Sequence, residues 1–269
     1  MIASEILDHY GNGQEEQRLA RSLGRLERLR TEEIVGRYLP PPPCRILDVG
    51  GGTGVYALSL SRQGYEVHLI DAVPLHVERV RALSAASEAP LANATVGDAR
   101  GLELPDDMFD VVLLFGPLYH LIDRNDRTAA LTEARRVLIP RGLLLSAYIS
   151  RFASACDGIQ GGMLRDAAFS AIVEQDLADG IHQNPTNRPE WFTTAYFHRP
   201  EEIRPEIEEA GLRFDSAIAV EGPGWVPEAL DAWLDDAAAR ERLLRVLRRI
   251  ETEPSLIGAS AHVIAVARK

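Results

Sequence analysis

A glycine-rich turn between an apolar strand and a helical segment constrains this sequence more than any other feature. Residues 44–54 read Cys-Arg-Ile-Leu-Asp-Val-Gly-Gly-Gly-Thr-Gly, an apolar run that carries Asp48 and then turns. The turn contains the glycines Gly50, Gly51, Gly52 and Gly54. Glycines let a ligand lie against the main chain, and the helical spacing after the turn directs the first amides of a helix toward that ligand. The pattern predicts a nucleotide or nucleoside site.

Length and charge narrow the class of protein. The chain has 269 residues, which is enough for one large α/β domain or for one domain with an added lid, and we expect no second independent domain. The formal net charge of −11 disfavours an unaided grip on a phosphate backbone, because such a grip needs a basic face. Nucleic acid is therefore a poor candidate for the substrate, although a local basic patch stays open.

The cysteines and the chain start indicate the compartment. Cys44 and Cys156 are too far apart in sequence to define a disulfide framework or a zinc site. No metal-ligand spacing is present elsewhere, so we expect a reaction without a metal. The first residues lack a basic region followed by an apolar core, and no apolar run approaches the roughly 20 residues of a membrane span. We therefore expect a soluble cytoplasmic protein that does not enter a membrane.

Four prolines mark the clearest boundary in the chain. Apolar residues among Glu and Arg in residues 14–39 have the spacing of one or two amphipathic helices that pack on the main domain. The prolines at 40–43 end any helix, because proline has no amide donor and restricts the residue before it. We therefore divide the chain into an N-terminal helical segment, 1–39, and a main domain, 40–269.

Strands and helices alternate from the glycine turn onward. The sequence predicts further strands at 65–71, 94–96, 109–115 and 143–149, and helices at 56–62, 74–83 and 127–138. Such alternation is typical of a parallel sheet with helices on both faces, which is the doubly wound α/β class.

The alternation breaks after the fifth strand. Residues 151–195 are rich in Gly, Asp and Asn, and we interpret this long connection as a lid over the site. The α/β pattern then resumes with a helix that begins near Pro205, a strand around 217–220, one long amphipathic helix over 227–250 and a final strand at 261–267.

Three acidic residues follow three successive strands. Asp48, Asp71 and Asp98 lie at or just after the strand ends, and ligands of an open parallel sheet bind beyond those ends. Asp71 is positioned to accept both hydroxyls of a ribose. Asp98 can accept from the exocyclic amine of an adenine while the amide of Ala99 or Arg100 donates to a ring nitrogen. Asp48 can hold the glycine turn or a ligand ammonium; the alternatives are a cap for Asp48 and an ordinary turn aspartate for Asp98.

A nicotinamide cofactor is the first alternative. Residues 52–57 fit the pattern G-x-G-x-x-A, and Asp71 lies about where a ribose-binding acid should. An NAD-dependent oxidoreductase is disfavoured by the acid two residues before the first glycine and by the second acidic signature at 97–98. No obvious Lys, Tyr or His set for hydride transfer is present either.

The order of these motifs resembles that of the class I S-adenosylmethionine-dependent methyltransferases, within the methyltransferase type 11-like group that acts mainly on small molecules. Residues 47–54 resemble the family's D/E-x-G-x-G-x-G loop. Residues 135–142 resemble its R-V-L-K-P-G-G turn before the fifth strand, with Arg141 where the family often has glycine. The other matching segments are Asp71, 97–99, 109–112 and 260–269.

The resemblance implies a seven-stranded, mostly parallel Rossmann-like sheet with an antiparallel last strand, and S-adenosylmethionine as cofactor, with S-adenosylhomocysteine as its product. It also implies that the segment after the fourth strand borders the methyl group, with Phe115 and Gly116 on the cofactor side. Tyr119 and His120 then become candidates for the general base or for contacting the substrate, although a histidine after an apolar strand is also common as a packed residue. Tyr10 is a candidate for closing over the cofactor.

Histidine and aromatic side chains in and after the lid are candidates for the acceptor pocket, since aromatics supply large rigid contact area. They are His182, Trp191, Phe192, Tyr196 and His198. Each is also a candidate for the core. The sequence leaves open whether oxygen, nitrogen or carbon of a small-molecule acceptor is methylated and whether the protein is a monomer or a homodimer. It also leaves open a non-catalytic or RNA-acting S-adenosylmethionine-binding protein.

Overall fold

One mixed sheet forms the centre of the molecule in the computed structural model, which describes residues 18–269 except 21, 187 and 228. The described residues contain the strands β1 (Arg45–Val49), β2 (Glu66–Asp71), β3 (Asn93–Val96), β4 (Phe109–Leu114), β5 (Leu138–Ser150), β6 (Ile181–His182), β7 (Ala195–His198), β8 (Arg213–Ala219) and β9 (His262–Arg268). The central order is β3-β2-β1-β4-β5-β9-β8. Neighbours from β3 to β5 are parallel, whereas β9 is antiparallel to β5 and β8. The prediction of a mostly parallel sheet with an antiparallel last strand is confirmed.

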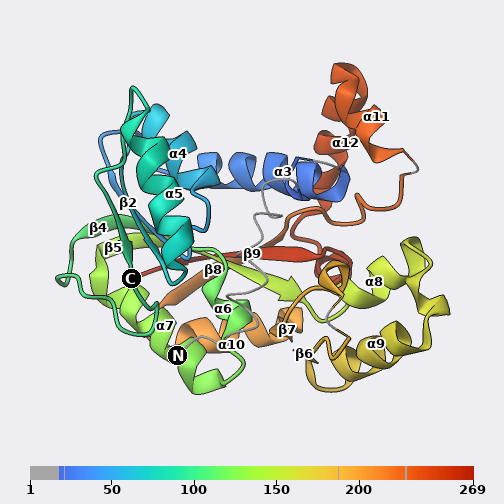
Figure 1. The fold of residues 1–269 in the computed structure, drawn as a ribbon. Coiled ribbons are helices and arrows are strands. Elements are labelled where there is room, and N and C mark those ends of the chain that lie inside the picture. The colour runs from blue at the N-terminus through green and yellow to red at the C-terminus, as the bar shows by residue number, and fades with distance from the viewer. Residues whose placement is uncertain (1–17, 21, 187, 228) are drawn as a thin grey trace.

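Helices cover both faces of the sheet (Figure 1). They are α3 (Ser22–Tyr38), α4 (Val55–Arg62), α5 (Pro74–Ala85), α6 (Pro117–His120), α7 (Arg124–Val137), α10 (Pro200–Glu209), α11 (Leu230–Asp235), α12 (Ala237–Ile250) and α13 (Pro254–Ile257), besides those of an insertion after β5. α3, α4 and α5 cover one face, and α7 and α10 cover the other. No helix in the described part of the chain is long and apolar enough to cross a membrane.

Strand β1 shows why the sequence forms this sandwich. Successive side chains of a strand point to opposite faces, so Ile46 packs with α3 to α5, while Leu47 and Val49 pack in the cluster that includes α7 and α10. All three are buried. A strand that is apolar on both faces is typical of a sheet covered by helices on both sides.

Helix α3 is tied to the far end of the sheet by a buried charge. The side chain of Arg30 is fully buried, donates to the carbonyl of Val220 at 3.1 Å and to Glu33 at 2.8 Å, and pairs with Glu251. Because a buried guanidinium needs such partners, the helix is fixed in rotation. Glu27 of α3 is thereby held beside the start of β9.

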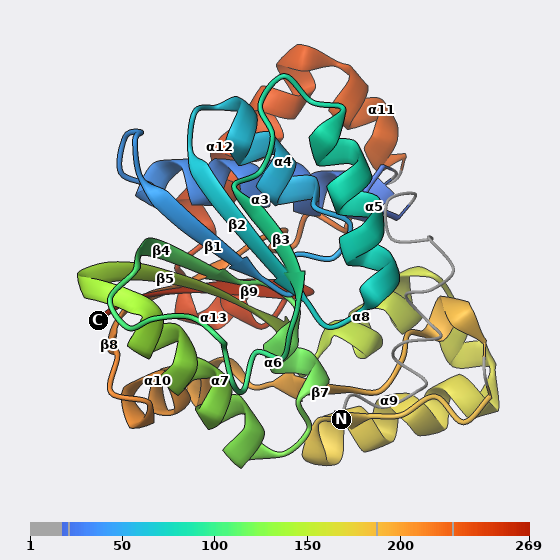
Figure 2. The ribbon, with the colours of Figure 1, turned by 60° about the vertical axis from the view of Figure 1, so that its left-hand side comes forward.

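The insertion between β5 and β7 is helical rather than irregular. It contains α8 (Ala153–Gln160), the short 3-10 helices η1 (Met163–Arg165) and η2 (Pro189–Trp191), α9 (Ala167–Asp179) and strand β6. A small apolar cluster of its own includes Phe169, Ile172 and Trp191. β7 pairs with the last residues of β5, so the insertion lies at the carboxyl ends of the strands (Figure 2).

Two sequence predictions for the last third of the chain are wrong. The helix expected to begin near Pro205 begins at Pro200. The Glu202 carboxylate accepts the Arg199 amide at 2.8 Å and fixes this earlier start. Pro205 therefore lies inside α10, where it costs the helix one backbone hydrogen bond. The single helix expected over 227–250 is divided into α11 and α12. Asp236 has extended backbone there and caps α12.

Candidate active site

A cavity of about 470 Å³ opens at the carboxyl ends of the parallel strands. Its wall is formed by residues that follow β1, β2, β3 and β4, by β5 and β9, and by α3. The sheet order therefore divides it into two halves. We call the part at β1, β2 and β3 the first half, and the part at β4, β5 and β9 the second half.

The glycine turn forms the floor of the first half. Gly50 has φ of +73°, and a Cβ there would lie 2.4 Å from the Cδ of Pro117, so only glycine fits between β1 and the segment after β4. Gly52 also has positive φ, but a Cβ would meet nothing within 4 Å. Its main chain therefore faces open space, as a turn that contacts a ligand requires. Gly54 directly precedes α4 as its N-cap and does not line the cavity.

Asp48 is the only described carboxylate with both oxygens buried and without a hydrogen-bond partner. It lines the cavity although its side chain is fully buried. Burial, and then the charge of Asp71, raise the pKa of Asp48 to about 7. A buried acid of this kind needs an explanation, and a cation bound in the cavity would supply the missing partner.

Asp71 connects the end of β2 to the glycine turn. Its carboxylate accepts the amides of Gly52 and Val73, each at 2.8 Å, and lies 3.2 Å from the Nδ1 of His76. A carboxylate has about four acceptor positions, and these three contacts leave about one for a ribose hydroxyl. His76, which also lines the cavity, was missed because nothing in its sequence context distinguishes it from an ordinary helical residue.

Asp98 lies in the first half, paired with Arg100. Arg100 binds the Asp98 carboxylate at 2.6 Å and that of Asp126 at 2.7 Å, and its amide donates to Asp98 at 2.9 Å. These hydrogen bonds to Arg100 lower the pKa of Asp98, so it is ionised at neutral pH. Ala99, buried beside it, also lines the cavity.

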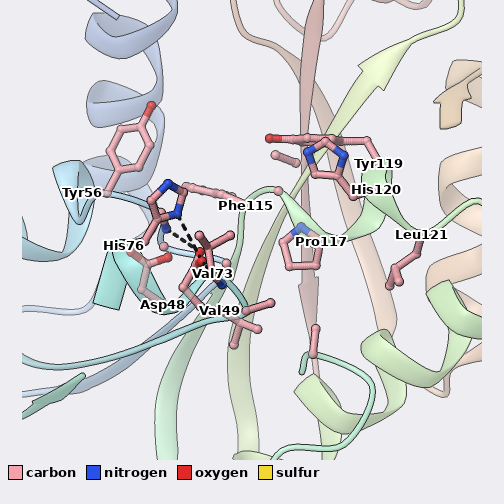
Figure 3. Close-up of a pocket in the computed structure, with 18 of the residues that line it drawn as sticks. Asp48, Val49, Tyr56, Val73, His76, Phe115, Pro117, Tyr119, His120 and Leu121 are labelled. Carbon is pink, nitrogen blue, oxygen red and sulfur yellow. Dashed lines mark hydrogen bonds and ion pairs between the residues drawn. The ribbon is translucent and has the colours of Figure 1, made fainter. Parts of the chain in front are cut away.

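The segment after β4 lies where the two halves meet, because β4 is the neighbour of β1. Phe115 and Gly116 line the cavity, as do Tyr119 and His120 of α6. Figure 3 shows Tyr119 and His120 across the cavity from Asp48. The Nδ1 of His120 lies 3.2 Å from the carbonyl of Thr194, so this nitrogen carries a proton and donates. The sequence candidates after β4 therefore come together with the glycine turn.

The five candidates in and after the insertion do not line this cavity, although the ring of Phe192 lies 5.9 Å from that of His120. His182 is buried between the Asp176 carboxylate, 2.9 Å from Nδ1, and the carbonyl of Trp191, 2.8 Å from Nε2. Trp191 packs in the insertion's apolar cluster. Tyr196 and His198 belong to a network around Glu206, described below. His182, Trp191 and His198 are buried, which fits the alternative of a packed residue, whereas Tyr196 is half-buried. Tyr10 lies outside the described residues.

Comparison with known proteins identifies the family. A model described as a methyltransferase domain matches residues 46–142. The demethylmenaquinone methyltransferase of Deinococcus radiodurans is 31% identical over 175 residues, which cover 64% of this chain and 68% of the relative. The chain belongs to the class I S-adenosylmethionine-dependent methyltransferases. A ubiquinone/menaquinone biosynthesis C-methyltransferase of Caulobacter is 35% identical over 137 residues, covering 48% of this chain and 53%, about half, of the relative's length.

Solved methyltransferases share the fold of this one. A structure from Methanosarcina mazei, described as S-adenosylmethionine-dependent, superposes with a TM-score of 0.59 at 16% identity. The match covers 88% of this chain and 96% of that one. At such low identity the similarity shows the fold alone.

The residues of this methyltransferase fit the family's cofactor. S-adenosylmethionine carries an ammonium, ribose hydroxyls and an adenine. The first half of the cavity offers an unpartnered buried carboxylate in Asp48, open main chain at Gly52, and hydrogen-bonding groups at Asp71, His76 and Asp98. The space in front of Gly52 is open, because a Cβ at that position would meet no atom within 4 Å.

Sequence reasoning missed most of the second half. Arg18 and Glu27 line the cavity, together with His262 at the start of β9. The sequence offered no signal for this grouping, because Glu27 and His262 are 235 positions apart and meet only in the folded chain, where Arg30 fixes α3 and β9 pairs with β5. Tyr56, in α4 after the glycine turn, also lines it and was missed as well.

Proposed function

We propose that this methyltransferase transfers a methyl group from S-adenosylmethionine to a small-molecule acceptor. The observation that supports this most is the convergence of the glycine turn with Asp48, Asp71 and Asp98 on one cavity of about 470 Å³. Cavities of roughly 300 to 1,000 Å³ suit a small molecule. The net charge of −11 and the acids around the cavity disfavour nucleic acid as the acceptor.

The first half holds the cofactor in this proposal. Asp48 binds the ammonium, Asp71 and His76 bind ribose hydroxyls, and Asp98 with the Ala99 amide binds the adenine. When bound, the cofactor supplies an electrophilic methyl group on a sulfonium. The protein's part is to fix the reacting groups in line, and orientation of this kind contributes about 7 to 11 kcal/mol to catalysis.

The second half holds the acceptor. Tyr119 and His120 contact it beside the methyl group. Because Nδ1 of His120 donates to the Thr194 carbonyl, the ring's orientation is fixed before the acceptor binds. The relatives named above act in quinone biosynthesis according to their names. A small molecule with an aromatic or conjugated body is the corresponding acceptor class here.

The insertion acts as a lid over the second half. Thr194, just before β7, lines the cavity, and the ring of Phe192 lies 5.9 Å from that of His120. The helices α8 and α9 carry this segment at the carboxyl edge of the sheet. A lid at this position excludes water from the transfer.

Two measurements test the proposed function. S-adenosylhomocysteine should bind in calorimetry and raise the melting temperature, and labelled methyl from S-adenosylmethionine should appear on a low-molecular-weight acceptor, with EDTA leaving the rate unchanged. Binding of NADH, followed by its nicotinamide fluorescence, is measured alongside for comparison with S-adenosylhomocysteine binding. Binding of NADH without binding of S-adenosylhomocysteine would favour the oxidoreductase instead. Tight S-adenosylhomocysteine binding with no turnover across a broad acceptor library would favour a non-catalytic role.

A further inference from the structure

A cluster of charged side chains lies at the end of the second half, away from the glycine turn. His262 begins β9 and pairs with Ile149 at the end of β5, so it stands three strands from β1, roughly 14 Å at the usual strand spacing. Arg18, Glu27 and His262 line the cavity.

Glu221 fixes the orientation of the His262 ring. Its Oε1 accepts from the Nδ1 of His262 at 2.6 Å, while its Oε2 accepts the His262 amide at 3.0 Å and the Ser260 hydroxyl at 2.8 Å. The Glu221 side chain is fully buried. Since Nδ1 faces this buried carboxylate, the exposed fifth of the imidazole is the opposite edge, which carries Nε2. Within the described residues, Nε2 makes no hydrogen bond, so it is the ring atom available to a ligand in the cavity.

Nearby carboxylates keep His262 protonated. The Glu27 carboxylate of α3 lies 3.7 Å from Nδ1, and Asp157 of α8 and the Arg18 guanidinium also interact electrostatically with the ring. Burial by itself would lower the pKa of His262, but Glu27 and Glu221 outweigh it and raise the pKa to about 9. At neutral pH, Nε2 is therefore a charged donor.

The cluster also has the spacing of a metal site, because one ligand atom from each of Glu27, Glu221 and His262 lies within 4.8 Å of the others. Its carboxylates already have cationic partners. The Arg18 guanidinium binds both oxygens of Glu27, at 2.5 and 3.0 Å, and the protonated Nδ1 of His262 donates to Glu221. The arrangement therefore favours an organic ligand that accepts a hydrogen bond from Nε2.

The walls around the cluster define the rest of that ligand. Val220, whose amide donates to the His262 carbonyl, lines the cavity together with Ile264 of β9 and its partner Ala147, and Leu19 adds further apolar surface. Such a pocket binds an apolar body with one oxygen directed at the imidazolium. A charge-assisted hydrogen bond is about twice as strong as a neutral one, so the anionic form of that oxygen is preferred.

We propose that His262, oriented by Glu221, binds an ionisable oxygen of the acceptor, of the phenol or enol class, in its anionic form. This inference rests on the proposed function, since it assigns the acceptor to the second half. The acceptor's proton leaves to solvent when the anion binds. His262 thus recognises the acceptor and favours its ionised form.

The test uses para-nitrophenol, whose absorbance distinguishes phenol from phenolate. It is titrated with pH in the presence of the full-length protein, with and without S-adenosylhomocysteine. We expect binding that lowers the probe's apparent pKa, and a loss of phenolate affinity of about tenfold to a hundredfold in His262→Gln, the range for a hydrogen bond to a charged group. His68→Gln, which alters a histidine remote from the cavity that pairs with Glu66, should match the wild type.

A second measurement uses the wild type, so that its result does not depend on whether the His262→Gln variant folds. Imidazole NMR of the wild type should show the His262 resonances, but not those of His68, shifting when para-nitrophenol is added. Equal phenolate affinity in His262→Gln, no binding of the probe, or a rise in melting temperature with Zn²⁺ that His262→Gln abolishes would overturn the proposal. S-adenosylhomocysteine binding is measured separately, so its failure would reject the proposed function while the titration without it still reports on His262.

Discussion

The two halves of the cavity differ in the groups that form their walls. The first half is made of main chain and short turns: the glycines after β1, and Asp71 holding the Gly52 and Val73 amides at 2.8 Å. The second half is made of side chains from distant elements, with Glu27 of α3 and Glu221 after β8 converging on His262 of β9. The first is suited to one invariant ligand. The second can change with single substitutions and is suited to set acceptor specificity.

The largest effect is expected from a substitution that disrupts the glycine turn of the first half. Gly50→Ala places a Cβ 2.4 Å from Pro117 at a positive φ, so the turn must move. We expect no measurable S-adenosylhomocysteine binding by calorimetry and a loss of roughly 2 to 4 kcal/mol of unfolding free energy. The control is Gly36→Ala in α3, where a Cβ meets nothing within 4 Å and stability should rise by up to about 1 kcal/mol. Wild-type affinity in Gly50→Ala would contradict the role of the turn.

The next effect concerns the scaffold behind the second half. Glu206 of α10 binds Arg127 of α7 at 2.7 Å and lies 3.1 Å from Nε2 of His198, and all three side chains are buried. Glu206→Gln leaves the guanidinium without its counter-charge, so we expect a loss of about 3 kcal/mol in urea unfolding at pH 7. Glu208→Gln, which alters an exposed pair with Arg204, should change stability by less than about 1 kcal/mol.

The same variant has a defined pH dependence. Burial would raise the pKa of Glu206, but hydrogen bonds from His198 and Arg127 outweigh it and lower the pKa to about 2 from an ordinary value of 4.5. Its contribution is therefore fully present above about pH 4.5 and is lost as the pH falls toward 2. The stability gap between wild type and Glu206→Gln should narrow over that window. A constant gap would refute the ion-pair explanation.

An intermediate effect separates binding from stability at Asp48. Because burial raises its pKa to about 7, the folded state holds a proton that the unfolded state releases near 3.8, and apo stability falls as pH rises between these values. Asp48→Asn should flatten this dependence and stabilise the apo protein at pH 8. It should also weaken S-adenosylhomocysteine binding about tenfold to a hundredfold at that pH. Glu66→Gln, at an exposed carboxylate, is the control, and weaker apo stability in Asp48→Asn would contradict the account.

The smallest effect concerns a sequence candidate outside the cavity. Tyr196 places its hydroxyl 3.3 Å from both Glu202 and Arg151, and its ring under Arg127. Tyr196→Phe removes the hydroxyl alone, so we expect a stability loss of about 1 kcal/mol in thermal unfolding. Cofactor affinity and KM for the acceptor should stay unchanged. A raised KM at normal stability would return Tyr196 to the acceptor site.

The contrast between the halves also explains what could be predicted from sequence. The strand at 45–49, the glycine turn and the acids after three strands are local patterns, and parallel topology brings their ends to one edge without further information. The fold class and most of the first half followed from them. The position of His76 could not be predicted, because its contact with Asp71 depends on the rotation of α5 about its axis.

The second half depends on contacts that no local pattern contains. Glu27 and His262 meet because Arg30 fixes α3 and because β9 runs antiparallel to β5. His182 and Trp191 looked like pocket residues by type, yet the helices of the insertion bury them in a core of their own. The lid role of 151–195 and the division at residue 40 stay predictions.

A crystal structure with S-adenosylhomocysteine tests the central claim most directly. We expect the ligand's ammonium within hydrogen-bond distance of Asp48 and its adenine beside Asp98 and Ala99. Its sulfur should face Tyr119 and the half of the cavity that ends at His262. A ligand bound in the reverse orientation, or with its adenine against His262, would contradict the division of the cavity into a cofactor half and an acceptor half.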